Sequence, residues 1–431
     1  MLLLTANLFK MKKNKIKVGI FIDGEFIPSN SGAANRFHYM SRYLNMRKEI
    51  DVVIFLGDRG WSKISMIKKE GFKTYVFNIG DFYQNIDSIT EIIKKEKIDL
   101  IQFDSIEQVL SQGAKIKSEL KIPIALEAHY DFINFAVNSN FSKKEIDKKM
   151  DDLKLAKKII DGVICLSKDE LKTFQKFFNG RDTILKVIPS GVDLGEIKPN
   201  QVNFKSKKCI FLGNMFFHPN EVAVDFIYNK IYKKLFKRGY IFVMIGDAPE
   251  VIIQKYKSKG FVFTGKVNNL NTVFKDALCA LAPVFHGAGM RIKLLNYAAA
   301  GLPTLITKTG AEGFPAQELL GIINKEDFVN EIELLEEKKE QWTDNNSKLY
   351  EYISRNLTWE TLAVKASDFY RKIIDSRPEN HSARDVSIDF KSEPSWLVEV
   401  VKKGRFTNLK ASVKKGFYKK VYKGLVKTEK L

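Results

Sequence analysis

Short apolar segments alternate with amphipathic ones through the first half of the chain. Each apolar segment has the length of a buried strand, and the segments between them repeat apolar residues every three or four positions, as helices do. The predicted strands are 18–23, 52–56, 74–77, 100–103, 122–126, 162–166 and 185–188. The helical pattern is clearest at 33–45 and 142–161. This alternation predicts a parallel sheet with helices on both faces.

The same rhythm starts again after a turn-forming segment at 189–193, which we interpret as a structural turn, and a polar linker at 198–208. The strands predicted for the second half are 209–212, 240–245, 261–264, 279–282 and 304–307. Its predicted helices are 222–236, 270–277 and 292–300. The fold class is therefore α/β, with two doubly wound, Rossmann-like domains. We expect the carboxyl ends of their strands to face a cleft, because ligands bind there in open α/β sheets.

The chain has 431 residues, of which 45% are apolar, and this suits two globular domains with an appendage. Cys165, Cys209 and Cys279 stand singly, and the histidines are scattered, so we expect a reducing compartment and no metal site. No apolar run approaches the roughly 20 residues that cross a bilayer. The apolar start lacks the features of a signal peptide, and either Met1 or Met11 is the true start.

The formal net charge is +20, and lysines are spread through every segment. No nucleic-acid-binding motif is present, so we expect no nucleic-acid partner. The tail at 391–431 differs, because it carries twelve Lys or Arg against three acidic residues. Its apolar residues recur at three- and four-residue steps: Phe406, Leu409, Val413, Phe417, Val421 and Leu425. This pattern predicts a basic amphipathic helix that lies on an anionic membrane surface, with packing on the body of the protein as the alternative.

The segment 282–314 carries the clearest chemical signal. Gly287 and Gly289 would let the backbone approach a ligand closely, and Arg291 and Lys293 place two cations at the start of a helix. Backbone N–H groups at a helix N-terminus, together with fixed cations, bind phosphate or pyrophosphate.

This segment resembles the group 1 (family 4) glycosyltransferases, which transfer sugar from a nucleotide-sugar donor with retention at the anomeric carbon. The residues that match the family pattern are Pro283, Gly287, Gly289, Arg291, Lys293, Gly301, Pro303, Gly310, Glu312 and Gly313. Asn296 departs from the pattern, since the family carries there a Glu that hydrogen-bonds the donor ribose. Ala288 replaces an upstream Glu that this variant of the pattern commonly lacks.

The resemblance implies the GT-B architecture. The acceptor-side domain would span 15–197, the nucleotide-sugar-binding domain 205–355, and a helix at 356–376 would cross back to the first domain. The implied donor-binding residues are Gly213, Gly287, Gly289, Asn296, Gly310, Glu312 and Gly313. Asn220 also follows Gly213 at a helix start, and its pattern predicts an N-cap.

In the first domain, the family places a catalytic-pocket histidine after the strand that corresponds to 122–126. His129 matches it, and Glu127 either contributes or braces His129. Gly32 and Arg36 follow the first strand and match, loosely, a loop that contacts acceptor and phosphate. A plain strand-to-helix turn is the alternative for that loop.

The predicted function is a retaining glycosyltransferase that moves a sugar from a nucleotide-diphospho-sugar to a glycan or lipid-linked acceptor. It would work as a peripheral protein on the cytoplasmic face of the cell membrane, in polysaccharide or cell-envelope biosynthesis. His129, Arg291 and Lys293 are the predicted catalytic residues, and the two cations would neutralise charge on the departing diphosphate without metal or cofactor. Two alternatives remain: a sugar-nucleotide epimerase of the same architecture, and a non-catalytic subunit that binds nucleotide-sugar or carbohydrate.

Overall fold

The computed structural model describes residues 15–29, 31–128, 142–286 and 289–376. The predictions for Met1 or Met11 as the start, for His129 and Gly287, and for the tail at 391–431 therefore fall outside the described residues. Among the helices of the described ranges, none has the length and apolar character needed to cross a membrane.

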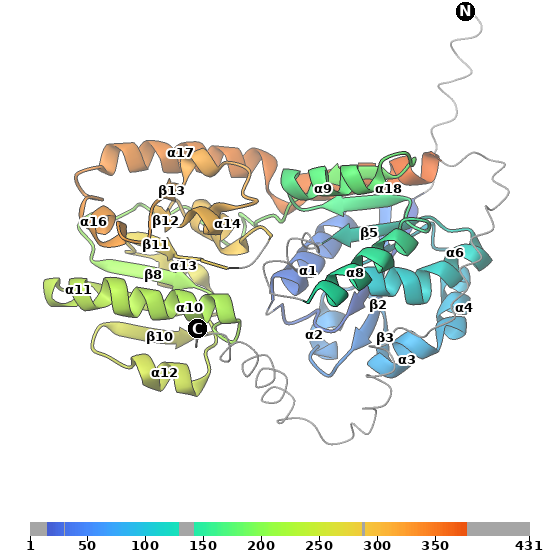
Figure 1. Ribbon diagram of the computed structural model, residues 1–431, viewed down its shortest axis with the longest axis horizontal. Helices are drawn as coiled ribbons and strands as arrows, with labels where there is room; N and C mark the ends of the chain where they lie inside the picture. The colour runs from blue at the N-terminus through green and yellow to red at the C-terminus, as the bar shows by residue number, and fades with distance from the viewer. Residues whose placement is uncertain (1–14, 30, 129–141, 287–288, 377–431) are drawn as a thin grey trace, which may run out of the picture. The chain divides into compact units, whose positions relative to one another are not determined.

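The first sheet is entirely parallel and has the order β3-β2-β1-β4-β5-β6-β7 (Figure 1). Its strands are β1 (Ile16–Asp23), β2 (Ile50–Asp58), β3 (Lys73–Asn78), β4 (Leu100–Phe103), β5 (Ile124–Ala128), β6 (Gly162–Cys165) and β7 (Ile184–Val187). Strands β4, β5 and β6 are buried along their whole length, which explains their unbroken apolar runs.

Helices connect these strands on both faces of the sheet, as parallel pairing requires. They are α1 (Gly32–Asn45), α2 (Ile64–Lys69), α3 (Ile79–Gln84), α4 (Ile86–Glu96), α5 (Ile106–Gln108), a π-helical turn (Val109–Gly113), α6 (Ala114–Leu120), α8 (Lys143–Ala156) and α9 (Lys168–Phe178). Ser142 and Ser167 form capping boxes with Glu145 and Glu170, which fix the starts of α8 and α9.

The second sheet is also parallel, in the order β10-β9-β8-β11-β12-β13. Its strands are β8 (Lys208–Leu212), β9 (Ile241–Ile245), β10 (Phe261–Gly265), β11 (Cys279–Ala282), β12 (Thr304–Ile306) and β13 (Gly321–Ile322). Strands β9 and β10 extend the sheet to one side of β8, whereas β11, β12 and β13 extend it to the other. The boundary between β8 and β11 is thus the topological switch point, the place where doubly wound sheets bind ligands.

The helices of this second part are α10 (His218–Phe226), a π-helical segment (Ile227–Tyr232), α11 (Lys233–Leu235), a 3-10 turn (Phe236–Arg238), α12 (Glu250–Tyr256), α13 (Leu270–Phe274), α14 (Ile292–Ala299), α15 (Lys308–Ala311), a second 3-10 turn (Gln317–Leu319), α16 (Phe328–Glu333) and α17 (Lys339–Asn356). Apolar side chains fill both faces of the sheet. Leu294 and Leu295 of α14 pack into one core cluster, and Ile227 and Ile231 of the π-helical segment pack into the other.

The last described helix, α18 (Trp359–Asp375), belongs to the core of the first sheet, as Figure 1 also shows. Its residues Trp359, Leu362, Phe369 and Ile373 are buried in the same cluster as α1 and β1. Gly162 of β6 makes room for the helix, because a Cβ atom there would lie 2.3 Å from Ile373 Cδ1. Helix α18 therefore packs on the first sheet.

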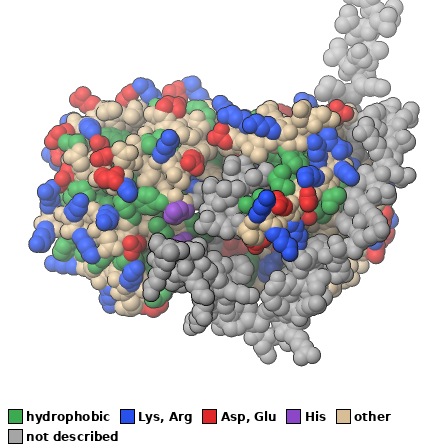
Figure 2. Space-filling view, viewed as in Figure 1, with side chains coloured by type: hydrophobic (Ala, Val, Ile, Leu, Met, Phe, Trp, Pro, Cys, Tyr) green, Lys and Arg blue, Asp and Glu red, His purple; other side chains and the backbone are tan. Residues whose placement is uncertain are grey.

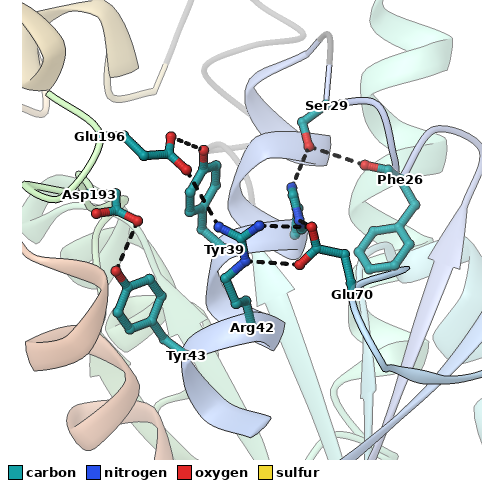
Figure 3. Close-up of polar contacts among 9 residues, drawn as sticks. Phe26, Ser29, Tyr39, Arg42, Tyr43, Glu70, Asp193 and Glu196 are labelled. Atoms are coloured by element: carbon teal, nitrogen blue, oxygen red, sulfur yellow. Dashed lines mark hydrogen bonds and ion pairs between the residues drawn. The ribbon is translucent and has the colours of Figure 1, made fainter. Parts of the chain in front are cut away.

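The turn at 189–193 is structural, as expected. Val192 N–H donates to Leu357 O at 2.9 Å, and Trp359 N–H donates to Val192 O at 3.3 Å, so the chain leaving the first sheet pairs with the chain returning to it. Figure 3 shows α1 beside this segment: Tyr43 Oη donates to Asp193 Oδ2 at 2.9 Å, and Tyr39 and Arg42 bond to Glu196.

Most predicted elements are found within two residues of their expected bounds. The strand predicted at 122–126 lies at Ile124–Ala128, and the helix predicted at 142–161 ends at Ala156. Strand β13 has two residues, too few to give a sequence pattern. On the face shown in Figure 2, basic side chains are interspersed with acidic ones among the described residues.

Candidate active site

Two helices begin at the switch point of the second sheet. The chain enters α10 after β8 and enters α14 after β11, and these two strands are neighbours. Asn220, in the first turn of α10, accepts a hydrogen bond from Lys293 Nζ, in the first turn of α14, at 2.8 Å. The N–H groups at the starts of both helices are thus held beside a lysine, an arrangement that favours an anion.

Lys293 has an unusual environment for a lysine. Its Nζ lies 4.1 Å from the centroid of the buried Phe211 ring of β8, and its hydrogen-bond partner is a neutral amide. In the described part of the chain, no carboxylate forms an ion pair with it. Burial, with the charge of Arg291 as a second cause, lowers the pKa of Lys293 to about 7. A dianionic ligand would restore the ammonium form.

Arg291 is the N-cap residue of α14, and its Nη1 donates to Gly289 O at 2.6 Å. Burial lowers the pKa of Arg291, while the charge of Glu312 acts in the opposite direction. Gly289 and Gly313 have φ values of 82° and 77°, which favour glycine. A Cβ atom on Gly313 would lie 3.5 Å from Met290 N, so the loops after β11 and β12 lie close together here.

Gly213 positions Asn220. A Cβ atom at Gly213 would lie 2.8 Å from Asn220 Cγ, so only glycine lets this side chain rest against the backbone. Asn220 Nδ2 donates to Asn214 O at 2.9 Å, which directs its Oδ1 to Lys293. The prediction of Asn220 as an N-cap is wrong: α10 begins at His218 with Phe217 as its N-cap residue, because Pro219 fits the first helical turn.

Of the remaining predicted donor-binding residues, Asn296 and Glu312 are open to a ligand, whereas Gly310 is buried. Asn296 lies one turn after Lys293 on α14 and therefore on the same helix face, with no hydrogen-bond partner for its side chain among the described residues. Glu312 is exposed at the end of α15. Gly310, in contrast, is buried: its N–H donates to Thr307 Oγ1, and a Cβ atom there would lie 2.6 Å from Ile306 Cγ1. Packing explains this glycine without a ligand.

Arg36 does not reach for a ligand. It is 1% exposed, its Nε donates to Glu127 Oε1 at 2.8 Å, and its Nη1 donates to Pro189 O at 2.5 Å. The guanidinium thus neutralises a buried carboxylate, and the predicted contact of Arg36 with phosphate is wrong. Gly32 is the first residue of α1, whose N-cap Ser31 accepts from Ala34 N.

Glu127 is the centre of a wider buried network. Gln102 of β4 donates from Nε2 to Glu127 Oε2 at 3.1 Å, and Tyr370 of α18 donates from its hydroxyl to Gln102 Oε1 at 2.5 Å. The network joins α1, β4, β5 and α18. Sequence spacing gave no sign of it, because Arg36 and Glu127 are 91 positions apart.

Within the described ranges, no group of three or more His, Cys, Asp or Glu side chains is arranged to hold a metal ion. The chemistry of the site described above is that of lysine, arginine, amide and backbone N–H groups.

Comparison with known proteins agrees with this architecture. The family model described as "Glycosyl transferases group 1" matches residues 206–337, and the model described as "Glycosyltransferase Family 4" matches residues 30–196. These ranges cover most of both sheets. The chain belongs to the group 1 (family 4) glycosyltransferases with the GT-B fold. A search of curated proteins finds no match to the sequence.

Solved structures share the fold at low sequence identity. A glycosyltransferase from Rickettsia africae is 13% identical, with a TM-score of 0.64, over 85% of this chain and 100% of that one. HepE from Anabaena, in complex with UDP and glucose, is 13% identical, with a TM-score of 0.62, over 83% of this chain and 100% of that one. TarM of S. aureus, in complex with UDP and alpha-GlcNAc-glycerol, is 11% identical, with a TM-score of 0.61, over 82% of this chain and 99% of that one.

Proposed function

We propose that this glycosyltransferase transfers a sugar from a nucleotide-diphospho-sugar, with retention of anomeric configuration, to a glycan or lipid-linked acceptor. We further propose that it acts without a metal ion, as a peripheral protein on the cytoplasmic face of the cell membrane. The basic tail at 391–431 would contribute the attraction to anionic lipid.

The observation that carries the proposal is the site of Lys293. A lysine whose partners are an amide oxygen and an aromatic ring has unused capacity for an anion, and it stands where two helix N-termini begin beside the switch point. The pyrophosphate of a nucleotide-sugar fits this chemistry. UDP is bound in the HepE and TarM structures, so uridine diphosphate is the first nucleotide to test.

Catalysis follows from charge. When the glycosidic bond of the donor breaks, negative charge grows on the departing diphosphate. Lys293, Arg291 and the backbone N–H groups beside them would stabilise it in a partly buried site, where such interactions are strong. Asn296 would contact the ribose from the same helix face, and His129 remains the proposed contact to the transferred sugar.

The test measures sugar transfer and donor hydrolysis by purified full-length variants, after a thermal-shift screen of UDP-, GDP- and ADP-sugars. Lys293→Met keeps the alkyl chain over Phe211 but removes the charge, and we expect kcat/KM to fall about 100- to 1,000-fold. Lys257→Ala, at an exposed position after α12, is the matched control and should leave kcat/KM unchanged. Wild-type kcat/KM in Lys293→Met and Arg291→Ala would overturn the assignment.

A non-catalytic binding role is the second candidate, and Asn296 is the observation that favours it. If Asn296→Glu gains transfer activity that the natural protein lacks, while both bind UDP, the natural chain is a binding subunit. An epimerase would instead convert a nucleotide-sugar to its epimer with no acceptor present.

A further inference from the structure

An exposed tryptophan stands at the carboxyl edge of the first sheet. Trp61 is 53% exposed and follows β2 in the loop that leads to α2. Its six-membered ring lies against Gly24, the residue after β1, since a Cβ atom built on Gly24 would lie 3.3 Å from Trp61 Cζ3. Gly24 has a φ of 105°, which favours glycine. The indole therefore rests on backbone with part of its surface open to solvent.

The loop that carries Trp61 is fastened in place. Asp58 Oδ1 accepts the N–H groups of Trp61 and Ser62 at 3.2 and 3.1 Å. Ser62 Oγ in turn accepts from Phe26 N at 3.1 Å, which ties this loop to the one after β1. An exposed ring held this firmly loses little conformational entropy when a ligand covers it.

Charged groups border the ring. Arg59 lies over it, with Cζ 5.8 Å from the centroid, and forms a two-bond pair with Asp23 at 2.8 and 2.9 Å. Tyr83 Oη also donates to Asp23 Oδ2, at 2.6 Å. Asp23 N–H donates weakly to Asp104 Oδ2, at 3.4 Å, so a second carboxyl group adjoins the first. The site thus joins a flat apolar surface to a fixed set of donors and acceptors.

We propose that Trp61, Arg59 and Asp23 form the platform on which a pyranose ring of the acceptor lies. One face of a pyranose is a patch of C–H groups that matches an aromatic ring, and its rim of hydroxyl groups matches a paired guanidinium and carboxylate. This inference rests on the proposed function, since it supplies the acceptor side of the same transfer. The place suits it, because ligands of open α/β sheets bind beyond the carboxyl ends of the strands.

Two other ligands fit less well. A nucleotide would bring phosphate groups toward Asp23 and Asp58, against one Arg59. An anionic membrane would be repelled by the same carboxylates. However, Lys63 and the exposed Ile64 and Met66 on this surface would favour contact with a membrane. The membrane is therefore the outcome that the experiment has to separate from a saccharide.

The experiment uses saturation-transfer NMR on the full-length protein with methyl glucopyranosides, methyl galactopyranosides and methyl N-acetylglucosaminides as probes. We expect wild type and Trp61→Phe to bind at least one probe, and Trp61→Ala to bind it at least ten times more weakly. Met46→Ala is the matched control: Met46 is 72% exposed and ends α1, at the opposite edge of the sheet, and the variant should bind as wild type does.

Donor chemistry is measured on the same proteins. UDP binding and donor hydrolysis without acceptor should be equal in wild type and Trp61→Ala, because Trp61 is not part of the second sheet. If wild type neither binds UDP nor hydrolyses a donor, the proposed function is overturned. The saccharide measurement then still decides whether Trp61 binds a pyranose. The inference fails if wild type binds none of the probes, if Trp61→Ala binds them as wild type does, or if Trp61→Ala weakens only binding to vesicles of anionic phospholipid.

Discussion

Lys293 Nζ donates to Asn220 Oδ1 at 2.8 Å, and this bond joins the first turns of the two helices that begin at the switch point of the second sheet. The partner is neutral, so the lysine keeps a pKa of about 7, set by burial and by the charge of Arg291. The consequence can be measured as a proton balance.

We expect binding of UDP at pH 8 to take up close to one proton per site. A lysine with a pKa of about 7 is mostly neutral at that pH. A bound diphosphate favours the charged form and raises the pKa, so the lysine gains a proton from the solution. Isothermal titration calorimetry in buffers with different ionisation heats gives the number of protons as a slope.

Two variants control this measurement. Lys293→Met should show a slope near zero and weaker binding. Asn220→Asp places a carboxylate beside the lysine and raises the pKa of Lys293 before UDP binds. Proton uptake on UDP binding should therefore disappear in this variant too. The added negative charge should also weaken UDP binding about ten-fold or more. A zero slope for wild type would contradict the prediction.

The buried pair of Arg36 and Glu127 makes a prediction about stability. Arg36→Met leaves Glu127 buried without its cation, and breaking such a pair costs about 3–5 kcal/mol of unfolding free energy. Urea unfolding followed by tryptophan fluorescence measures the loss. Adding Glu127→Gln removes the stranded charge, so the double variant should be more stable than Arg36→Met alone. Equal stability of wild type and Arg36→Met would show that the pair contributes nothing.

The sequence predicted the parts of this molecule that depend on short-range pattern. Strand β4 and strand β11 have the bounds that the apolar runs indicated, and the glycine-rich segment does lead into α14. Both arise from neighbours along the chain, which a sequence displays directly.

The sequence did not reveal relationships between distant residues. The sequence predicted a phosphate contact for Arg36, because its true partner, Glu127, lies 91 positions away and could not be recognised from the pattern. The sequence predicted Asn220 as an N-cap. Its bond to Lys293 could not be predicted, because it depends on β8 and β11 being neighbours in the sheet. Trp61 belongs to no sequence motif. Only its contact with Gly24 and its exposure in the structure indicate a binding surface.

Gly162 tests how closely α18 packs on the first sheet. We expect Gly162→Ala to cost about 1–3 kcal/mol, because its Cβ would lie 2.3 Å from Ile373 Cδ1 and 2.8 Å from Phe369 Cζ. The shift in thermal unfolding temperature measures this. Val has no Cδ1 atom, so Gly162→Ala with Ile373→Val should recover part of the loss. A double variant less stable than the sum of the two single changes would contradict this packing.

Asp104 predicts how stability depends on pH. Burial, with the charge of Asp23 as a further cause, raises the pKa of Asp104 well above its usual value. In the unfolded chain this carboxyl group loses its proton near pH 4. Above that pH the folded protein holds a proton that the unfolded chain has released, so this group lowers the free energy of unfolding as pH rises, until the folded group also ionises.

Asp104→Asn removes this penalty. The variant should therefore unfold at a higher temperature than wild type at pH 8, and the difference should shrink as the pH approaches 4, where wild-type Asp104 is protonated in both states. Asp182→Asn, at an exposed aspartate, is the control and should show no such trend. The contrary result is that Asp104→Asn is less stable than wild type by the same amount at pH 8 and at pH 5. The ionised carboxylate would then stabilise the fold, and the direction assigned to the pKa of Asp104 would be wrong.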